Sequence, residues 1–166
     1  MKCLARVLVL MALTIGCWAQ GHGGIVFLVR HAEKASNAKD ALLTDEGHQR
    51  AQCLGHLLAD ADIHKIFATE VTRTQQTADP LSTILGLQPV IMDPYDIKGI
   101  LAQLQSDTDE NILVVAHSDT LPHILEGLGA RKTKILKDEF DRLFVFRYDD
   151  SGKQGTVTTL RYCDCK

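Results

Sequence analysis

The 166-residue sequence has no excess of positive charge, no internal repeat and no low-complexity segment. Lysine and arginine number 18 against 21 aspartates and glutamates, which gives a formal net charge of −3 at pH 7. This mildly negative balance argues against a nucleic-acid-binding surface. Hydrophobic residues make up 45% of the chain and charged residues 23%, as is ordinary for a soluble globular protein. The length suits one domain with a sizeable core.

The sequence also lacks an apolar run long enough to cross a bilayer. Residues 7–15 are apolar and follow two positive charges, which is the pattern of a signal peptide. Small residues, Cys17 and Ala19, occupy the two positions that a signal peptidase reads. We therefore expect a cleaved signal over residues 1–19, a single domain over residues 20–166, a periplasmic or secreted protein, and no membrane span after cleavage. A membrane anchor, a buried first helix and a lipoprotein modified at Cys17 are the alternatives.

The chain has five cysteines, and export changes how they are interpreted. The exported chain keeps Cys53, Cys163 and Cys165, an odd number that leaves at least one thiol unpaired within the chain. A bridge between Cys163 and Cys165 would be strained, since one residue separates them. A link from Cys53 to the C-terminal pair and an unpaired core role for Cys53 both stay open. A metal site at the C-terminal pair lacks further ligands nearby.

The most informative stretch begins with an apolar run over residues 25–29 and stops at Arg30 and His31. Such a run predicts a strand buried on both faces, as in a parallel sheet with helices on either side. Ligands of open α/β sheets bind beyond the carboxyl ends of the strands. An arginine fork beside an imidazole at that place suits an anion, phosphate above all.

Residues 111–116 repeat this pattern and end at His117. Because both histidines follow buried strands, we expect them on the same edge of a parallel sheet. Alternating segments complete a three-layer α/β/α sandwich with a mostly parallel, mixed sheet and an antiparallel edge. The other predicted strands cover residues 63–68, 89–92, 142–148 and 156–162, and the predicted helices begin at Thr44 and cover residues 69–85, 97–104 and 121–128. Pro80 is expected to perturb or divide the second of these helices.

Arg73 lies in the first turn of the helix that follows the second strand, where free backbone N–H groups add to an anion site. A single histidine after a strand, or a single arginine near a helix start, is more often structural. The ordered set of Arg30, His31, Arg73 and His117 is a much stronger signal.

Four motifs in this order resemble the histidine phosphatase superfamily, also called phosphoglycerate mutase-like, and within it the small secreted-type members of branch 1. A fifth segment, residues 139–143, is similar to their C-terminal part. The motifs are Leu28-Val29-Arg30-His31-Ala32-Glu33, Leu43-Thr44-Asp45-Glu46-Gly47-His48-Gln49-Arg50-Ala51, Thr72-Arg73-Thr74-Gln75-Gln76-Thr77-Ala78 and Val114-Val115-Ala116-His117-Ser118-Asp119-Thr120-Leu121-Pro122.

The resemblance implies that His31 attacks phosphorus and forms a phosphohistidine, which water then hydrolyses. Arg30 and Arg73 would bind the phosphoryl oxygens, and His117 would stabilise charge in the transition state. The resemblance implies no metal and no cofactor, because the positively charged groups of the site replace a metal ion. The partner would be a small phosphorylated molecule, which the sequence does not identify, and the oligomeric state is equally undefined.

The leaving oxygen also needs a proton, for which a carboxylic acid is the usual donor. Asp93 and Asp96 lie in the loop beyond the Arg73 helix, and Asp119 lies beside His117. Each is also explained as a loop or capping residue. Glu33 is expected to orient neighbouring groups, whereas Glu70 would repel phosphate unless it points away or acts on a proton.

A metal-independent phosphomonoesterase is therefore the leading hypothesis. A mutase is weaker, because the chain has no room for the insertions of longer family members. A protein phosphohistidine phosphatase has a similar size, but such enzymes act on cytoplasmic proteins. The non-enzyme alternative is a phosphate-ligand binding protein on the same fold.

Overall fold

The computed structural model describes residues 23–149, 152 and 154–163. The predicted signal over residues 1–19 and Cys165 lie outside these residues. Within the described part, none of the helices has the length and apolar character needed to cross a bilayer. The elements follow one another as β1 (Ile25–Arg30), α1 (Asp45–Leu58), β2 (Ile63–Thr69), α2 (Thr72–Leu85), β3 (Val90–Met92), α3 (Ile97–Ser106), β4 (Asn111–Ala116), α4 (Leu121–Gly127), β5 (Arg142–Tyr148) and β6 (Gly155–Arg161).

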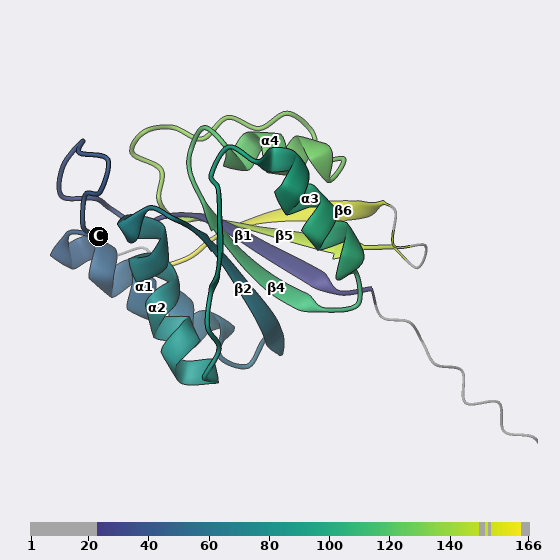
Figure 1. Cartoon of the computed structure of the whole chain (residues 1–166), viewed down its shortest axis with the longest axis horizontal. Coiled ribbons are helices and arrows are strands. Elements are labelled where there is room, and N and C mark those ends of the chain that lie inside the picture. Colours follow the sequence, from purple (N-terminus) through teal and green to yellow (C-terminus); the bar gives the residue numbers. More distant parts are fainter. Residues whose placement is uncertain (1–22, 150–151, 153, 164–166) are drawn as a thin grey trace, which may run out of the picture.

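One mixed sheet forms the middle layer, with the strand order β3-β2-β4-β1-β5-β6. The first four of these strands pair in parallel, and the β5–β6 hairpin adds an antiparallel edge. Helices α1 and α2 lie on one side of the sheet and α3 and α4 on the other (Figure 1). The predicted three-layer α/β architecture is confirmed.

The apolar run of β1 is buried on both faces, as its composition predicts. Leu28 packs in the cluster beneath α3 and α4, whereas its neighbour Val29 packs in the cluster beneath α1 and α2. Both side chains have no exposed surface. Alternate residues of one strand thus join the two halves of the core.

The register of β1 and β4 determines where the two histidines lie. These strands are parallel neighbours, and Arg30 pairs with Ala116 at their carboxyl ends. The chain continues this alignment for one more residue, because the N–H of His31 donates to the carbonyl of Ala116 at 2.9 Å. His31 and His117 therefore leave the sheet side by side.

Of the two effects expected of Pro80, division of the helix does not occur: α2 is continuous from Thr72 to Leu85. The proline packs against α1 at Gly55, where an added Cβ would lie 3.0 Å from the Cβ of Pro80. This close packing of α1 on α2 offsets the hydrogen bond that the proline ring cannot donate. Helix α1 begins as predicted, with the Thr44 hydroxyl accepting from the N–H of Gly47 at 3.0 Å.

The pairing of the cysteines, which the sequence leaves open, is between Cys53 and Cys163. This disulfide joins the middle of α1 to the chain just after β6. Cys163 lies in the left-handed region with a φ of 51°. The C-terminal segment is thereby held against α1, on the same side of the sheet as the loop that follows His31.

Candidate active site

His31 is almost completely buried, with 3% of its surface exposed. Its Nδ1 lies 2.7 Å from the carbonyl oxygen of Ala32. Since a carbonyl only accepts, Nδ1 carries the proton and donates it, which leaves Nε2 with a free lone pair. Burial, and then the nearby Arg30, Arg73 and His117, lower the pKa of His31 to about 3. The ring is neutral at physiological pH.

The ring of His117 lies edge-on to that of His31, with 5.4 Å between the centroids. Nη2 of Arg73 donates to Nδ1 of His117 at 3.3 Å, and Nε2 of His117 lies 3.0 Å from Oγ1 of Thr69. Burial, followed by the positive charge of Arg73, lowers the pKa of His117 to about 4. This second imidazole is therefore also neutral, with its proton on Nε2.

Two threonines fix this tautomer of His117, and sequence reasoning missed both. The hydroxyl of Thr74 donates to the carbonyl of Val71 at 2.7 Å, so its oxygen accepts from the hydroxyl of Thr69 at 2.9 Å. The oxygen of Thr69 in turn accepts from Nε2–H of His117. Thr69 and Thr74 are both buried. The sequence signal for this contact is Thr74, which directly follows Arg73 in the third motif.

Arg30 is buried and holds the loop before β5. Its Nη1 donates to the carbonyls of Leu136, Lys137 and Glu139 at 2.9–3.1 Å. Its guanidinium carbon lies 4.0 Å from the ring centroid of Phe140. Among the described residues, the buried Nε of Arg30 has no hydrogen-bond partner. Nη1 of Arg30 thus positions this loop, whereas its Nε–H is still able to donate a hydrogen bond.

Arg73 approaches the histidines from the start of α2. Its Nη1 donates to the carbonyl of Lys39 at 2.8 Å, and its buried Nε has no partner among the described residues. Thr77, one turn later, donates to the carbonyl of Arg73 at 2.7 Å and accepts from the N–H of Ala32 at 3.0 Å. This threonine fastens the start of α2 to the loop that carries His31.

A cavity of about 290 Å³ opens at this edge of the sheet. Arg73 and His117 line its inner part, and Tyr95, 75% exposed, stands at its mouth. The lining residues are Lys34, Asn37, Ala38, Lys39, Glu70, Val71, Arg73, Pro94, Tyr95, His117 and Asp119. The loop after β1, the start of α2 and the loop after β3 thus enclose a cavity that reaches His117, whereas Arg30 and His31 lie next to it and are not among its lining residues.

The candidate proton donors lie at different places. Asp119 lines the cavity, and its charge acts to raise the pKa of both Arg30 and His117. Asp93 and Asp96 are not among the lining residues: Asp93 accepts from the N–H of Tyr95, and Asp96 accepts from the N–H of Gly99 as the cap of α3, each at 2.9 Å. Both therefore have the local capping contacts that the sequence also allows.

Two further carboxylates lie in different surroundings. Glu70 lies in the cavity wall and pairs with Lys39 at 3.8 Å, with both side chains exposed. Glu33 does not line the cavity, and its Oε1 pairs with Nη2 of Arg50 at 2.7 Å. The described residues contain no group of three or more histidine, cysteine or acidic side chains arranged to hold a metal ion.

A mixed sheet that presents two strand-end histidines and two arginines at one edge is the arrangement of the phosphoglycerate mutase-like fold. The profile of the histidine phosphatase superfamily (branch 1) matches residues 26–95. The chain thus matches this superfamily over the segment that carries Arg30, His31 and Arg73.

Two curated relatives are similar to this chain over part of their length. A probable phosphoglycerate mutase of Erwinia tasmaniensis is 34% identical over 76 residues, which are 42% of this chain and 35% of the relative. A probable phosphoglycerate mutase of Enterobacter sp. (strain 638) is 32% identical over 125 residues, or 71% of this chain and 53% of the relative. The chain thus matches about a third to a half of their lengths.

Solved structures share the fold over most of the described chain. The protein histidine phosphatase SixA complexed with tungstate superposes with a TM-score of 0.71 and 20% identity, covering 86% of this chain and 99% of that one. An α-ribazole-5'-P phosphatase structure from Escherichia coli gives a TM-score of 0.66 and 18% identity, covering 84% and 96%. At these identities the likeness concerns the fold.

Proposed function

We propose that the protein is a metal-independent phosphomonoesterase that acts through a phosphohistidine on His31. The observation that carries this proposal is the state of His31: a neutral imidazole whose Nδ1 proton is donated to Ala32, so that Nε2 is free to attack. It lies beside Arg30, Arg73 and His117. A nucleophile that stays uncharged among positive groups suits attack on a phosphate dianion.

In the first step, the lone pair of Nε2 of His31 attacks phosphorus and the bond from phosphorus to the ester oxygen breaks. The leaving oxygen takes a proton from a carboxylic acid and departs as an alcohol. In the second step, the carboxylate takes a proton from a water molecule as the water oxygen attacks phosphorus; the nitrogen–phosphorus bond breaks, and inorganic phosphate (HPO4²⁻), neutral His31 and the reprotonated carboxylic acid are left. Arg30 and Arg73 hold the phosphoryl oxygens through both steps.

His117 is assigned to the phosphoryl oxygens as well. Its Nε2–H is committed to Thr69, so Nδ1, which accepts from Nη2 of Arg73 in the free protein, is the nitrogen that can face the substrate once Arg73 turns its N–H groups to the phosphoryl oxygens. A bound dianion favours protonation at Nδ1, which then donates a charge-assisted hydrogen bond to an equatorial oxygen. Loss of such a donor typically costs about 2.7–4 kcal/mol of transition-state stabilisation.

We assign the proton donor to Asp119. This carboxylate lies in the cavity wall and interacts electrostatically with both Arg30 and His117. Glu70 is the second candidate, since it shares the wall, but its carboxylate is paired with Lys39.

The substrate class we propose is a small phosphorylated molecule. The cavity volume of about 290 Å³ is close to the lower end, about 300 Å³, of typical small-molecule sites. A protein phosphohistidine phosphatase is the second candidate, and the structural likeness to SixA is what favours testing it. We also propose export to the periplasm or outside the cell, which the Cys53–Cys163 disulfide supports.

The test is hydrolysis of p-nitrophenyl phosphate, of a panel of phosphorylated metabolites and of a phosphohistidine peptide. Each is measured with and without a chelator, and with a His31→Ala control. We expect chelator-resistant turnover of small phosphomonoesters that the control lacks. Binding of inorganic phosphate without turnover would support the non-enzyme alternative, and selective turnover of the peptide would support the protein phosphatase.

A further inference from the structure

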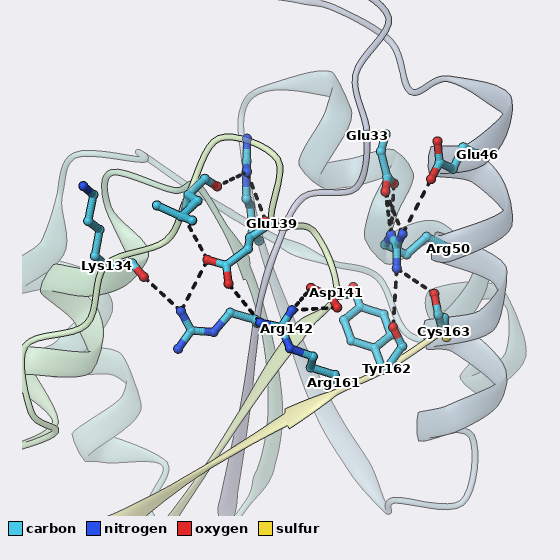
Figure 2. Close-up of polar contacts among 12 residues, drawn as sticks. Glu33, Glu46, Arg50, Lys134, Glu139, Asp141, Arg142, Arg161, Tyr162 and Cys163 are labelled. Atoms are coloured by element: carbon cyan, nitrogen blue, oxygen red, sulfur yellow. Dashed lines mark hydrogen bonds and ion pairs between the residues drawn. The ribbon is translucent and has the colours of Figure 1, made fainter. Parts of the chain in front are cut away.

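A buried ion pair lies directly behind the loop that carries His31. The carboxylate of Glu33 accepts from Nε of Arg50 at 2.8 and 3.0 Å and pairs with Nη2 at 2.7 Å. Arg50 is only 6% exposed. Figure 2 shows the guanidinium of Arg50 between Glu33 on one side and the C-terminal residues Tyr162 and Cys163 on the other.

This pair anchors the peptide group that orients His31. The carbonyl that accepts from Nδ1 of His31 belongs to the peptide bond between Ala32 and Glu33. Glu33 is held at both ends, because its own carbonyl accepts from the N–H of Thr44 at 2.9 Å while its carboxylate is bound by Arg50. Gly47 allows this approach, since a Cβ there would collide with the carbonyl of Glu33. A rotation of that peptide would remove the acceptor that keeps Nε2 unprotonated.

Arg50 is itself held by the C-terminal segment. Its Nη1 donates to the carbonyl of Cys163 at 2.8 Å and to that of Tyr162 at 3.4 Å. The carbonyl of Cys163 is presented by a residue with a φ of 51°, a conformation that L-residues seldom adopt. The disulfide to Cys53 fixes that residue to the same helix, one turn after Arg50. One face of α1 therefore holds the C-terminal segment both covalently and through the guanidinium.

We infer that Arg50 is a positioning residue for the nucleophile, and that the Cys53–Cys163 disulfide keeps Arg50 in place. The inference rests on the proposed function for its effect on turnover. Opening the disulfide takes two electrons and two protons from a dithiol, which becomes a cyclic disulfide while Cys53 and Cys163 become thiols. The carbonyl of Cys163 then loses its fixed place, Arg50 loses an acceptor, and the peptide between Ala32 and Glu33 is less constrained.

The tautomer of His31 is the direct readout, and it needs no catalytic activity. Long-range proton–nitrogen NMR of the imidazole measures how much of the ring carries its proton on Nδ1. We expect essentially one tautomer, Nδ1–H, in the oxidised wild-type protein. Glu33→Gln and Arg50→Lys keep side-chain size and a polar contact, and they should give a mixture of the two tautomers. Lys65→Met is the matched control, because it removes an ion pair of similar length, 2.9 Å to Asp107, near the amino ends of β2 and β4.

The disulfide is tested on the same signals. Adding dithiothreitol to the wild-type protein should shift His31 toward the mixture, and reoxidation should restore it. A Cys53→Ser/Cys163→Ser double variant should resemble the reduced wild type and should not respond to the dithiol. Turnover of p-nitrophenyl phosphate is followed in parallel, where we expect kcat to fall by up to about 100-fold with a smaller change in KM.

The outcomes separate the two proposals. A single Nδ1–H tautomer and unchanged kcat in folded Glu33→Gln, Arg50→Lys and reduced protein would overturn the positioning role. A mixture of tautomers in a wild-type-like fold, with no turnover by the wild type, would support the positioning role and overturn the proposed function. If neither ion-pair variant folds, the reduced wild-type protein decides between the same results.

Discussion

The imidazoles of His31 and His117 meet edge to face, 5.4 Å apart, although they end two different strands. Both have a pKa well below the ordinary value of 6.5, about 3 for His31 and about 4 for His117, chiefly because the fold buries them. Two buried, uncharged imidazoles lie near two arginines, and the positive charge of the arginines favours binding of an anion there. This relationship has consequences for stability, for catalysis and for the covalent chemistry.

The free energy of unfolding should fall as the pH falls below about 6.5. Unfolded histidines bind protons near pH 6.5, whereas His31 and His117 in the folded protein resist protonation until about pH 3 and 4. The stability that they contribute is complete above the unfolded pKa and is lost on acidification, by up to about 1.4 kcal/mol per pH unit for each histidine. Urea unfolding between pH 7.5 and 5 measures this slope.

A His31→Asn/His117→Asn variant is the control, since it retains every other titrating group. Its unfolding free energy should depend less steeply on pH between 6.5 and 5 than that of the wild type. Equal slopes for the two proteins would show that the histidines are not held neutral by the fold.

Thr69 should matter for catalysis although it lies behind His117. Thr69→Val has nearly the same shape but removes the hydroxyl that accepts from Nε2–H of His117 and donates to Thr74. We expect roughly a tenfold to hundredfold lower kcat, because small displacements of a catalytic group are costly. Thr69→Ser restores the hydroxyl and should restore most of the rate. Equal kcat values in the valine and serine variants, measured by steady-state kinetics, would leave the hydroxyl without a role.

Asp119 and Glu70 are distinguished by the leaving group. A proton donor matters most when the departing alcohol is a poor leaving group, so Asp119→Asn should slow hydrolysis of an alkyl phosphate far more than that of p-nitrophenyl phosphate. Glu70→Gln, the matched amide variant in the same wall, should slow both by a similar small factor. The ratio of kcat/KM for the two substrates is the measurement, and a changed ratio only in the Glu70 variant would transfer the role to that residue.

The sequence predicts the sheet edge well because the signals are local. An apolar run followed directly by a histidine occurs twice, and parallel pairing of β1 with β4 then brings His31 and His117 together without further information. The helix start at Thr44 is likewise encoded by a cap and adjacent acidic residues. Arg73 is placed by the first turn of α2. The catalytic roles of these residues stay predictions for kinetics to test.

Contacts between distant segments are what the sequence does not reveal. Arg30 binds three carbonyls of the loop before β5, and no periodicity or motif marks backbone acceptors. The choice of Cys163 over Cys165 as partner of Cys53 depends on where the chain turns after β6. Proline is normally disfavoured inside a helix, but at Pro80 the packing of α1 on α2 outweighs this local preference. In each case the deciding neighbour is remote along the chain.

The central claim is the covalent intermediate on His31. Wild-type protein is mixed with a ³²P-labelled phosphomonoester, quenched in alkaline denaturant within the first turnovers, and digested for mass spectrometry. We expect phosphate on His31 that is stable in alkali, is lost in acid, and is absent from a His31→Asn variant that shows no turnover. Turnover by the wild type with no phosphate on His31, or undiminished turnover by His31→Asn, would contradict the mechanism.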